Sequence, residues 1–385
     1  MRAARKTNEL YTYLMGCIEN GRFRIGEQIP TERDLAARFK LSRPTVAAAI
    51  HRLVKENMIR RGHKNGSVVV NLPPRKSLTF GAIILGLARH GREDTIFSSV
   101  GNEISYCASL DHSVVLLQDP SWGDEADDPG LTDRYRSMVD QFIARKVAGV
   151  FLMPQWILPN QHISVTTSLI EKLSQASIPV VLIDGDIIRY PARSRLDLIG
   201  IDNFHSGYIL AEHIITQGCR KIDFFALATR HPTQEARIAG YQKAMEVHGL
   251  RPDVAAVHYG DLLGGDFVVQ TLRRRRPDAI LVANDFRAVS VMRMAREAGF
   301  KIPSELRVGS FDDIPLSAHL PVPLTTIRQP SAGIGLAAYQ CMLQRINTPG
   351  IPPMHVQLSA DLVVRESCGC RIRLGSPAKV GTVSR

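Results

Sequence analysis

The sequence has few of the features that mark a membrane protein, a secreted protein or a disulfide-rich domain. It contains no apolar run of about 18 residues, the length that a membrane-spanning helix needs. Its first segment, MRAARKTNEL, has no apolar stretch after the charges, so it is not a secretory signal. The six cysteines are spread over 385 residues and form no disulfide framework. These absences predict a protein of the reducing cytoplasm that has no membrane partner.

Motifs of catalysis and of metal or cofactor binding are also missing. The chain has no GxSxG, HExxH or phosphate-loop motif. The segment GIGLAA at 333–338 fits the glycine pattern of a dinucleotide site, but it does not follow a predicted strand. Cys368 and Cys370 have neither zinc-type spacing nor a second pair, and the acidic segment 119–130 lacks EF-hand spacing. We therefore expect no catalytic residue, no metal site and no cofactor.

Positive charge is concentrated in the first fifth of the chain. Residues 1–76 contain 16 Lys and Arg against 6 Asp and Glu, a net charge of +10, whereas residues 77–385 contain 32 against 31. A basic module on a nearly neutral remainder predicts a polyanionic partner for that module. The length of the chain predicts two or three domains.

Residues 1–70 have the pattern of a winged helix-turn-helix domain. Leucine and isoleucine recur every fourth residue over 8–20 and predict a helix. Thr31 and Ser42 are predicted N-caps of two further helices, which are separated by a short turn. A short apolar strand, an Asn-Gly turn and the strand SVVV follow, and this order predicts a hairpin over 58–71.

This module resembles the winged-helix DNA-binding domain of the GntR family. The resemblance covers residues 8–70 and rests on GEQIPTERDLA, SRPTV and GSVV, which occur in the family's order and spacing. Ala47 departs from the family, which often has arginine there. Arginine can bind guanine through two hydrogen bonds, and Arg43 stands at the start of the predicted recognition helix. The residues that the resemblance places at DNA, with the hairpin near the minor groove, are Arg33, Ser42, Arg43, Thr45, His63, Lys64 and Gly66.

After residues 71–77, a proline-rich segment that we expect to be a semi-rigid linker, apolar runs alternate with amphipathic stretches. Near-continuous apolar strands separated by helices predict an α/β fold with parallel sheets covered on both faces. Residues 78–370 are many for one sheet, so we expect two lobes, and residues 371–385 look like a loose basic tail. The predicted strands lie at 80–87, 113–119, 149–154, 179–184, 197–202, 221–226, 279–285 and 307–313.

Several of these strands end in carboxylate or amide side chains. Asp184, Asn284 and Asp312 each stand at a strand end, and ligands of open α/β sheets bind at the carboxyl ends of strands. Such side chains can hold two adjacent hydroxyl groups, which suits a polyhydroxylated ligand such as a sugar. Arg237, near the start of a predicted helix, could supply the complementary donors.

Two further candidates follow other predicted strands. Arg89 comes after the first strand, and Trp156 comes after the strand that ends in MPQW. Trp156 could stack on the apolar face of a sugar ring or pack between the lobes. Structural roles are open for two acidic residues, because Asp202 could cap the following helix and Asp313 could complete a turn.

The second region is similar to the effector domain of the LacI/GalR repressors, which shares its fold with periplasmic sugar-binding proteins. The similarity covers about residues 78–367 and is carried by IDNFHSGYILAEHIITQGCRKIDFF, ARIAGYQKAM, the segment from AILVAND to SFDDI, PLTTIRQP and LVVRES. By position it implies that Arg237, Asn284 and Asp312 line an effector pocket between two lobes. The lobes that it implies are an N-lobe of 78–201 with 330–354 and a C-lobe of 202–329 with 355–367.

A GntR-like head on a LacI-like body resembles the arabinose-responsive repressors of that hybrid type. The resemblance implies a ligand-responsive transcription regulator, a repressor that a sugar releases from operator DNA. We also expect a homodimer, because two heads match a palindromic site. A purine or nucleoside is the alternative effector, since purine effectors occur among relatives. A sugar-binding transport receptor is disfavoured by the basic head and by the missing signal sequence.

Overall fold

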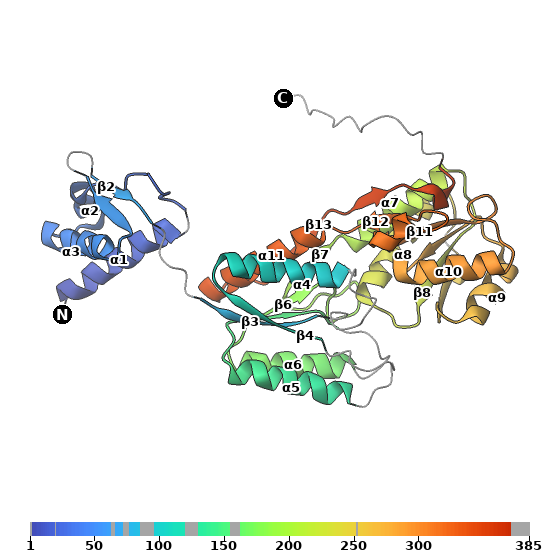
Figure 1. Cartoon of the computed structure of the whole chain (residues 1–385), viewed down its shortest axis with the longest axis horizontal. Coiled ribbons are helices and arrows are strands. Elements are labelled where there is room, and N and C mark those ends of the chain that lie inside the picture. The colour runs from blue at the N-terminus through green and yellow to red at the C-terminus, as the bar shows by residue number, and fades with distance from the viewer. Residues whose placement is uncertain are drawn as a thin grey trace, which may run out of the picture. The chain divides into compact units, whose positions relative to one another are not determined.

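The computed structural model describes residues 2–19, 21–62, 66–71, 77–84, 96–119, 130–154, 162–251 and 253–370. The chain divides into two compact units, residues 1–76 and residues 77–385, and each has its own hydrophobic core (Figure 1). Within these described ranges, no helix is both long enough and apolar enough to cross a membrane.

The first unit consists of three helices and a two-stranded wing. Thr31 and Ser42 cap the second and third helices, and each side chain accepts a hydrogen bond from the backbone N–H three residues later. The strands pair antiparallel, and apolar side chains of all three helices and both strands form one core. The predicted winged helix-turn-helix is therefore confirmed, although the first helix begins at Arg2 instead of residue 8. The elements are α1 (Arg2–Glu19), α2 (Glu32–Phe39), α3 (Arg43–Lys55), β1 (Ile59–Arg61) and β2 (Ser67–Val69).

The second unit contains two six-stranded sheets, which confirms the predicted α/β fold. In the first sheet all strands are parallel and their order is β13-β7-β6-β5-β3-β4. These strands are β3 (Thr79–Ile83), β4 (Val114–Gln118), β5 (Val150–Leu152), β6 (Val180–Ile183), β7 (Asp197–Ile201) and β13 (His355–Leu358). Helices cover both faces (Figure 1): α4 (Ile96–Leu110) and α11 (Ser331–Asn347) lie on one, and α5 (Leu131–Ala144) and α6 (His162–Gln175) lie on the other.

Strand β3 shows why a strand of this sheet has apolar residues on both of its faces. Phe80 and Ala82 belong to the core under α4 and α11, whereas Ile83 belongs to the core under α5 and α6. Gly81 also faces α5, and a Cβ atom there would lie 2.7 Å from the ring of Phe142. Because both faces are buried, the strand has no alternating polar positions.

The second sheet has the order β14-β12-β11-β10-β8-β9, and only β14 is antiparallel to its neighbour. The strands are β8 (Ile222–Leu227), β9 (Val257–Gly260), β10 (Ala279–Val282), β11 (Arg307–Asp312), β12 (Thr325–Arg328) and β14 (Asp361–Val363). The helices are α7 (Asn203–Thr216) and α8 (Pro232–Val247) on one face, and α9 (Gly265–Arg275) and α10 (Asp285–Glu297) on the other. Single-turn helices are η1 (Val254–Ala256), η2 (Pro315–Ala318) and η3 (Glu366–Cys368).

The chain passes between the two sheets after β7, after β12 and after β13. The last of these crossings, after β13, shows that one predicted boundary is wrong. The predicted C-lobe includes residues 355–358. They form β13, which pairs with β7 in the first sheet, with Gln357 opposite Gly200. The side chains of β13 are mostly exposed, so no apolar pattern in the sequence indicates which sheet the strand joins. Most of the expected linker (72–76) and all of the expected tail (371–385) lie outside the described residues.

Candidate functional site

The first turn of α3 presents the predicted DNA-contacting side chains to solvent. Ser42 and Arg43 are exposed, and Thr45 is half-buried with its hydroxyl oxygen 2.7 Å from that of Ser42. Val46 and Ile50 point the other way and are buried in the core. No ion pair involves Arg43 within the ranges that the structure describes, so its guanidinium is available for a base or a phosphate.

Arg33 on α2 is exposed as well, and its acidic neighbours are engaged elsewhere. Glu32 forms an ion pair with Arg61 of the wing at 3.0 Å. The carboxylate of Asp34 accepts a hydrogen bond from the Thr31 hydroxyl at 2.6 Å. The alternative in which Arg33 pairs with these two carboxylates is therefore not found among the described contacts.

The wing is closed at its base by a hydrogen bond. The backbone N–H of Gly62 donates to the carbonyl oxygen of Gly66 at 2.8 Å, and Gly66 has a φ of +82°, which glycine adopts readily. His63 and Lys64 lie outside the described residues. Contact of these three wing residues with DNA remains a prediction.

Arg237 of α8 is the centre of a buried polar cluster between the two sheets. Its Nε donates to the side-chain oxygen of Asn203 at 2.9 Å, and its Nη1 donates to the carbonyl oxygen of Ala283 at 2.8 Å. Nη2 lies 3.8 Å from Oδ1 of Asp312, and the guanidinium lies 4.6 Å from the centre of the Phe311 ring. Arg237 thus connects the start of α7 with the ends of β10 and β11.

Asp312 ends β11 in a left-handed conformation with a φ of 116°. Its Oδ1 also accepts a hydrogen bond from Gln329 at 2.7 Å. Burial raises the pKa of Asp312 to about 7; Arg237 opposes this shift, and the carboxylates of Asp285 and Asp184 add to it. Near neutral pH this carboxyl group is therefore divided between an acceptor form and a form that can donate a hydrogen bond.

Asp184, which follows β6, supplies an acceptor from the first sheet. Burial raises the pKa of Asp184 and the positive charge of Arg237 opposes the shift. Its Oδ1 is buried and accepts no hydrogen bond from any described residue. A buried carboxylate oxygen without a donor is costly, so a ligand hydroxyl at this position would relieve that cost.

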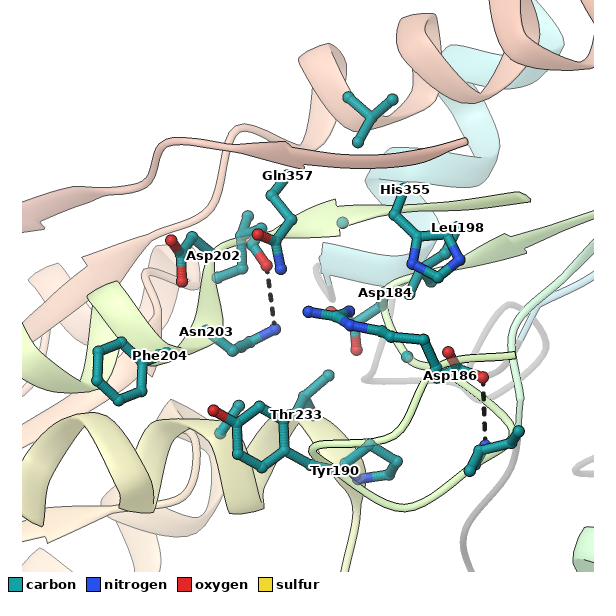
Figure 2. Close-up of a pocket in the computed structure, with 18 of the residues that line it drawn as sticks. Asp184, Asp186, Tyr190, Leu198, Asp202, Asn203, Phe204, Thr233, His355 and Gln357 are labelled. Atoms are coloured by element: carbon teal, nitrogen blue, oxygen red, sulfur yellow. Dashed lines mark hydrogen bonds between the residues drawn. The ribbon is translucent and has the colours of Figure 1, made fainter. Parts of the chain in front are cut away.

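A cavity of about 260 Å³, here named the Asp184 cavity, adjoins this carboxylate. Figure 2 shows Asp184, Asn203 and Thr233 on its wall, with the rings of Tyr190 and Phe204 also labelled around it. Its lining comes from the segment after β6 and from β13 on one side, and from the first turns of α7 and α8 on the other. A ligand in it would contact both lobes.

A second cavity of about 200 Å³, here named the Asp312 cavity, also has walls from both lobes. Asp312, Asp313, Arg328 and Gln329 supply polar groups, and Ile96 and Ser99 of α4 form the opposite wall. Of the predicted effector residues, Asp184 and Asp312 each line one of these cavities, whereas Arg237 lines neither and acts on both carboxylates through its positive charge. Arg89 and Trp156 lie outside the described residues.

Asn284 has a role that the sequence analysis did not foresee. Its side-chain oxygen caps α10 by accepting a hydrogen bond from the backbone N–H of Arg287 at 3.0 Å, and it lines neither cavity. Asp202 caps α7 in the same manner. Asn203, one of the polar residues at the predicted strand ends, and Gln329, which follows β12, are not among the predicted effector residues, although strand-end position is the signal that selected Asp184.

Two other findings define the chemistry of this region. His231, just before α8, has a pKa lowered to about 3 by burial and by Arg237, so its imidazole is neutral. Among the described residues, no group of three or more histidine, cysteine or acidic side chains is arranged to hold a metal ion. The polar groups that line the two cavities include carboxylates, amides, hydroxyls and the guanidinium groups of Arg193 and Arg328, a set that suits a polar organic ligand.

Two family models match the chain, one in each unit. Residues 6–69 match the model described as "Bacterial regulatory proteins, gntR family". Residues 211–368 match the model described as "Periplasmic binding protein-like domain". The first match contains the winged helix-turn-helix, and the second contains Arg237, Asp312 and Gln329.

Curated relatives include DNA-binding repressors. The arabinose metabolism transcriptional repressor of Geobacillus stearothermophilus is 23% identical over 372 residues, which are 93% of this chain and 96% of the relative. The HTH-type transcriptional repressor PurR of Vibrio campbellii is 26% identical over 273 residues, which are 68% of this chain and 74% of the relative. The first similarity spans both units of the chain.

Solved structures with the same fold include two transcription regulators. The complex of the transcriptional regulator CelR with cellobiose has a TM-score of 0.63 at 20% identity and covers 88% of this chain and 100% of that one. The transcription regulator CcpA of Lactococcus lactis has a TM-score of 0.63 at 18% identity and covers 76% of this chain and 99% of that one. At these identities the similarity establishes the fold.

Proposed function

The chain joins a GntR-type DNA-binding domain to a periplasmic-binding-protein-like effector domain of the LacI type, and we propose that it is a transcriptional repressor that a sugar releases from operator DNA. The observation that carries this proposal is the Arg237 cluster with its unpartnered Asp184 oxygen, which lies between two lobes of a domain attached to a basic head. A relative that matches the chain along both units is a transcriptional repressor by name, which supports the proposal.

The mechanism follows from a ligand that contacts both lobes. Carboxylates on the two sheets, Asp184 and Asp312, flank Arg237, so a bound sugar would favour the arrangement in which both lobes reach it. A ligand shifts a conformational equilibrium only by its difference in affinity for the two states. By linkage, operator DNA must weaken sugar binding by the same factor by which sugar weakens operator binding.

A nucleobase is the second candidate effector. Tyr190 and Phe204 at the Asp184 cavity offer aromatic rings on which a planar base could stack, and one relative is a purine repressor by name. A thermal-shift screen of the full chain over pentoses, hexoses and purines distinguishes the two candidates. A ligand that binds only the folded protein raises its melting temperature, and the stabilisation grows with the logarithm of the ratio of ligand concentration to the dissociation constant.

The experiment that tests DNA binding is selection of an operator from a random DNA pool by the full chain. Operator affinity should then fall steeply with salt, because each neutralised phosphate contributes a slope of about −0.9 to the dependence of log affinity on log salt. The sugar found in the thermal screen should lower operator affinity. Binding without salt dependence, or a ligand that leaves operator affinity unchanged, would contradict the proposed function.

Arg43→Ala should weaken operator binding by about 1–3 kcal/mol and relax specificity at one base position. The reason is that Arg43 is exposed in the first turn of the recognition helix and has no carboxylate partner among the described residues. Fluorescence anisotropy with single-base operator variants measures both effects. Arg273→Ala, at an exposed position on α9 of the second unit, is the matched control and should bind like the parent.

We also propose that two chains associate through the surface where α4 ends and β4 begins. Tyr106, Leu110 and Val114 are large apolar residues with exposed fractions of 58%, 63% and 54% there. β4 is an edge strand of its sheet, and an apolar patch beside an unpaired edge is a typical association surface.

Leu110→Asp should therefore raise the dissociation constant of the dimer at least about tenfold, because a charge would be buried at the interface. Sedimentation analysis of the full chain measures this change. Val247→Asp, at a position on α8 with an exposed fraction of 57%, should leave the dimer intact. A parent chain that sediments as a monomer at micromolar concentration rules out the association.

A further inference from the structure

The geometry points to a second, unrelated site: Cys368 and Cys370 are a thiol pair that hydrogen peroxide oxidises to a disulfide, with His213 as the base that activates Cys368. Three of the described cysteines, Cys219, Cys368 and Cys370, share the hydrophobic cluster under α7 and α8. All cysteines of the described residues are free thiols. This inference is independent of the proposed regulator function, because its test needs neither operator nor effector.

Cys368 lies in η3, and an imidazole from a distant part of the chain reaches it. Nε2 of His213, in the last turn of α7, is 3.3 Å from the Cys368 sulfur. The thiol also contacts the carbonyl oxygen of Arg365 at 3.2 Å. A sulfur and an imidazole nitrogen in hydrogen-bond contact allow the thiol proton to move to the imidazole, which leaves a nucleophilic thiolate.

The surroundings favour ionisation of the Cys368 thiol over that of Cys219 and Cys341. Burial opposes ionisation of Cys368, but hydrogen bonds from His213, from Thr325 and from the backbone N–H of Cys370 outweigh it and lower the pKa of the thiol. Burial raises the pKa of Cys219 and raises that of Cys341 to about 12. Because the thiolate is the form that reacts with peroxide, Cys368 is expected to be oxidised first.

Cys370 is placed to complete the reaction. Gly369 has a φ of +75°, and this turn directs the backbone N–H of Cys370 toward the Cys368 sulfur. The positive φ of Gly369 favours glycine, and a Cβ atom there would lie 2.8 Å from Nε of Arg307, so a larger residue would displace this arginine side chain. Cys370 is half-buried and Gly369 is exposed, so opening of the single turn η3 brings solvent to both sulfurs.

The chemistry balances with one peroxide. The Cys368 thiolate attacks one peroxide oxygen, an S–O bond forms and the O–O bond breaks, and the leaving hydroxide takes the proton from His213 as water. The Cys370 sulfur then attacks the sulfenic sulfur, an S–S bond forms and the S–O bond breaks, and a second water leaves. Two thiols are oxidised and one hydrogen peroxide is reduced to two waters.

The test is stepwise oxidation of the full chain with hydrogen peroxide, followed by alkylation and peptide mapping. The expected first product is a peptide with a Cys368–Cys370 disulfide, which has lost two hydrogens. Cys370→Ser should instead accumulate a sulfenic acid at Cys368 that a cyclic dione traps. Cys341→Ser, at a buried cysteine of the first lobe, is the matched control and should oxidise like the parent.

His213→Gln provides a readout that a purely structural role would not change. At neutral pH it should slow oxidation severalfold, because a smaller fraction of the Cys368 thiol is ionised, and the difference should shrink at alkaline pH, where the thiolate forms without a base. Its far-ultraviolet circular dichroism should match that of the parent. First oxidation at Cys219 or Cys341, or a histidine variant as fast as the parent at every pH, overturns the inference.

Discussion

Arg237→Lys is expected to weaken effector binding about a hundredfold and to abolish release of the operator at effector concentrations that release the parent. Arg237 donates from Nε to Asn203 and from Nη1 to the carbonyl of Ala283. Its planar guanidinium group fixes the directions of these two hydrogen bonds. A lysine ammonium is a single point and cannot occupy both positions. Loss of one or two charge-assisted hydrogen bonds in a buried cluster costs about 1.5–3 kcal/mol, and 1.4 kcal/mol is a factor of ten in affinity.

Calorimetry with the effector, and anisotropy of labelled operator with and without it, measure this effect. Operator affinity without effector should change less than about twofold, because Arg237 belongs to the second unit and the DNA-binding residues belong to the first. Arg293→Lys on α10 is the control, since this arginine is exposed and pairs only with Glu297 on its own helix. If Arg237→Lys binds effector as tightly as the parent, the Arg237 cluster is not the effector site.

Asp312→Asn should make the protein more stable than the parent at pH 8, and by a clearly smaller margin at pH 5. The pKa of Asp312 is raised to about 7 in the folded protein, from an ordinary value of 3.8. The folded state therefore binds the proton of Asp312 more tightly than the unfolded state does. The stability that this proton contributes is complete below the ordinary pKa and is lost as the pH rises from there through about 7.

The pKa shift of Asp312 sets an upper limit on the stability difference between Asp312→Asn and the parent. One unit of pKa corresponds to about 1.4 kcal/mol, which sets an upper limit of about 4 kcal/mol, and we expect about 2–3 kcal/mol because the side chain is 15% exposed. Urea unfolding of both proteins at pH 5 and pH 8 measures the difference. Asp361→Asn, at an exposed position on β14, should follow the curve of the parent. Equal stability of Asp312→Asn and the parent at both pH values would contradict the expectation.

The sequence by itself was sufficient to predict structural features that depend on residues close together along the chain. Thr31 and Ser42 mark two helix starts, because a hydroxyl three residues before a free backbone N–H caps it whatever the rest of the fold. The apolar runs that form the parallel strands were also recognisable, since strands buried on both faces have no polar positions. The basic head, the α/β body and the strand-end position of Asp184 and Asp312 follow from these local patterns.

Other features depended on groups that are distant in the chain. The sequence of β13 has no pattern that selects a sheet, and its assignment depends on the free edge of β7. Asn203 and Arg237 are brought together only because α7 and α8 pack so closely that a Cβ atom on Gly207 would lie 2.0 Å from the Arg237 carbonyl oxygen.

Asn284 shows a local effect that outweighed the predicted ligand role, whereas the contact of His213 with Cys368 depends on long-range packing. Asn284 stands at a strand end as Asp184 does, yet its oxygen caps α10, because the helix begins directly after it and its backbone N–H groups are nearer than any ligand. His213 and Cys368 are 155 residues apart and meet because η3 packs beside the last turn of α7. Local sequence determines which groups each element carries, and long-range packing determines which of those groups lie within hydrogen-bond distance of each other.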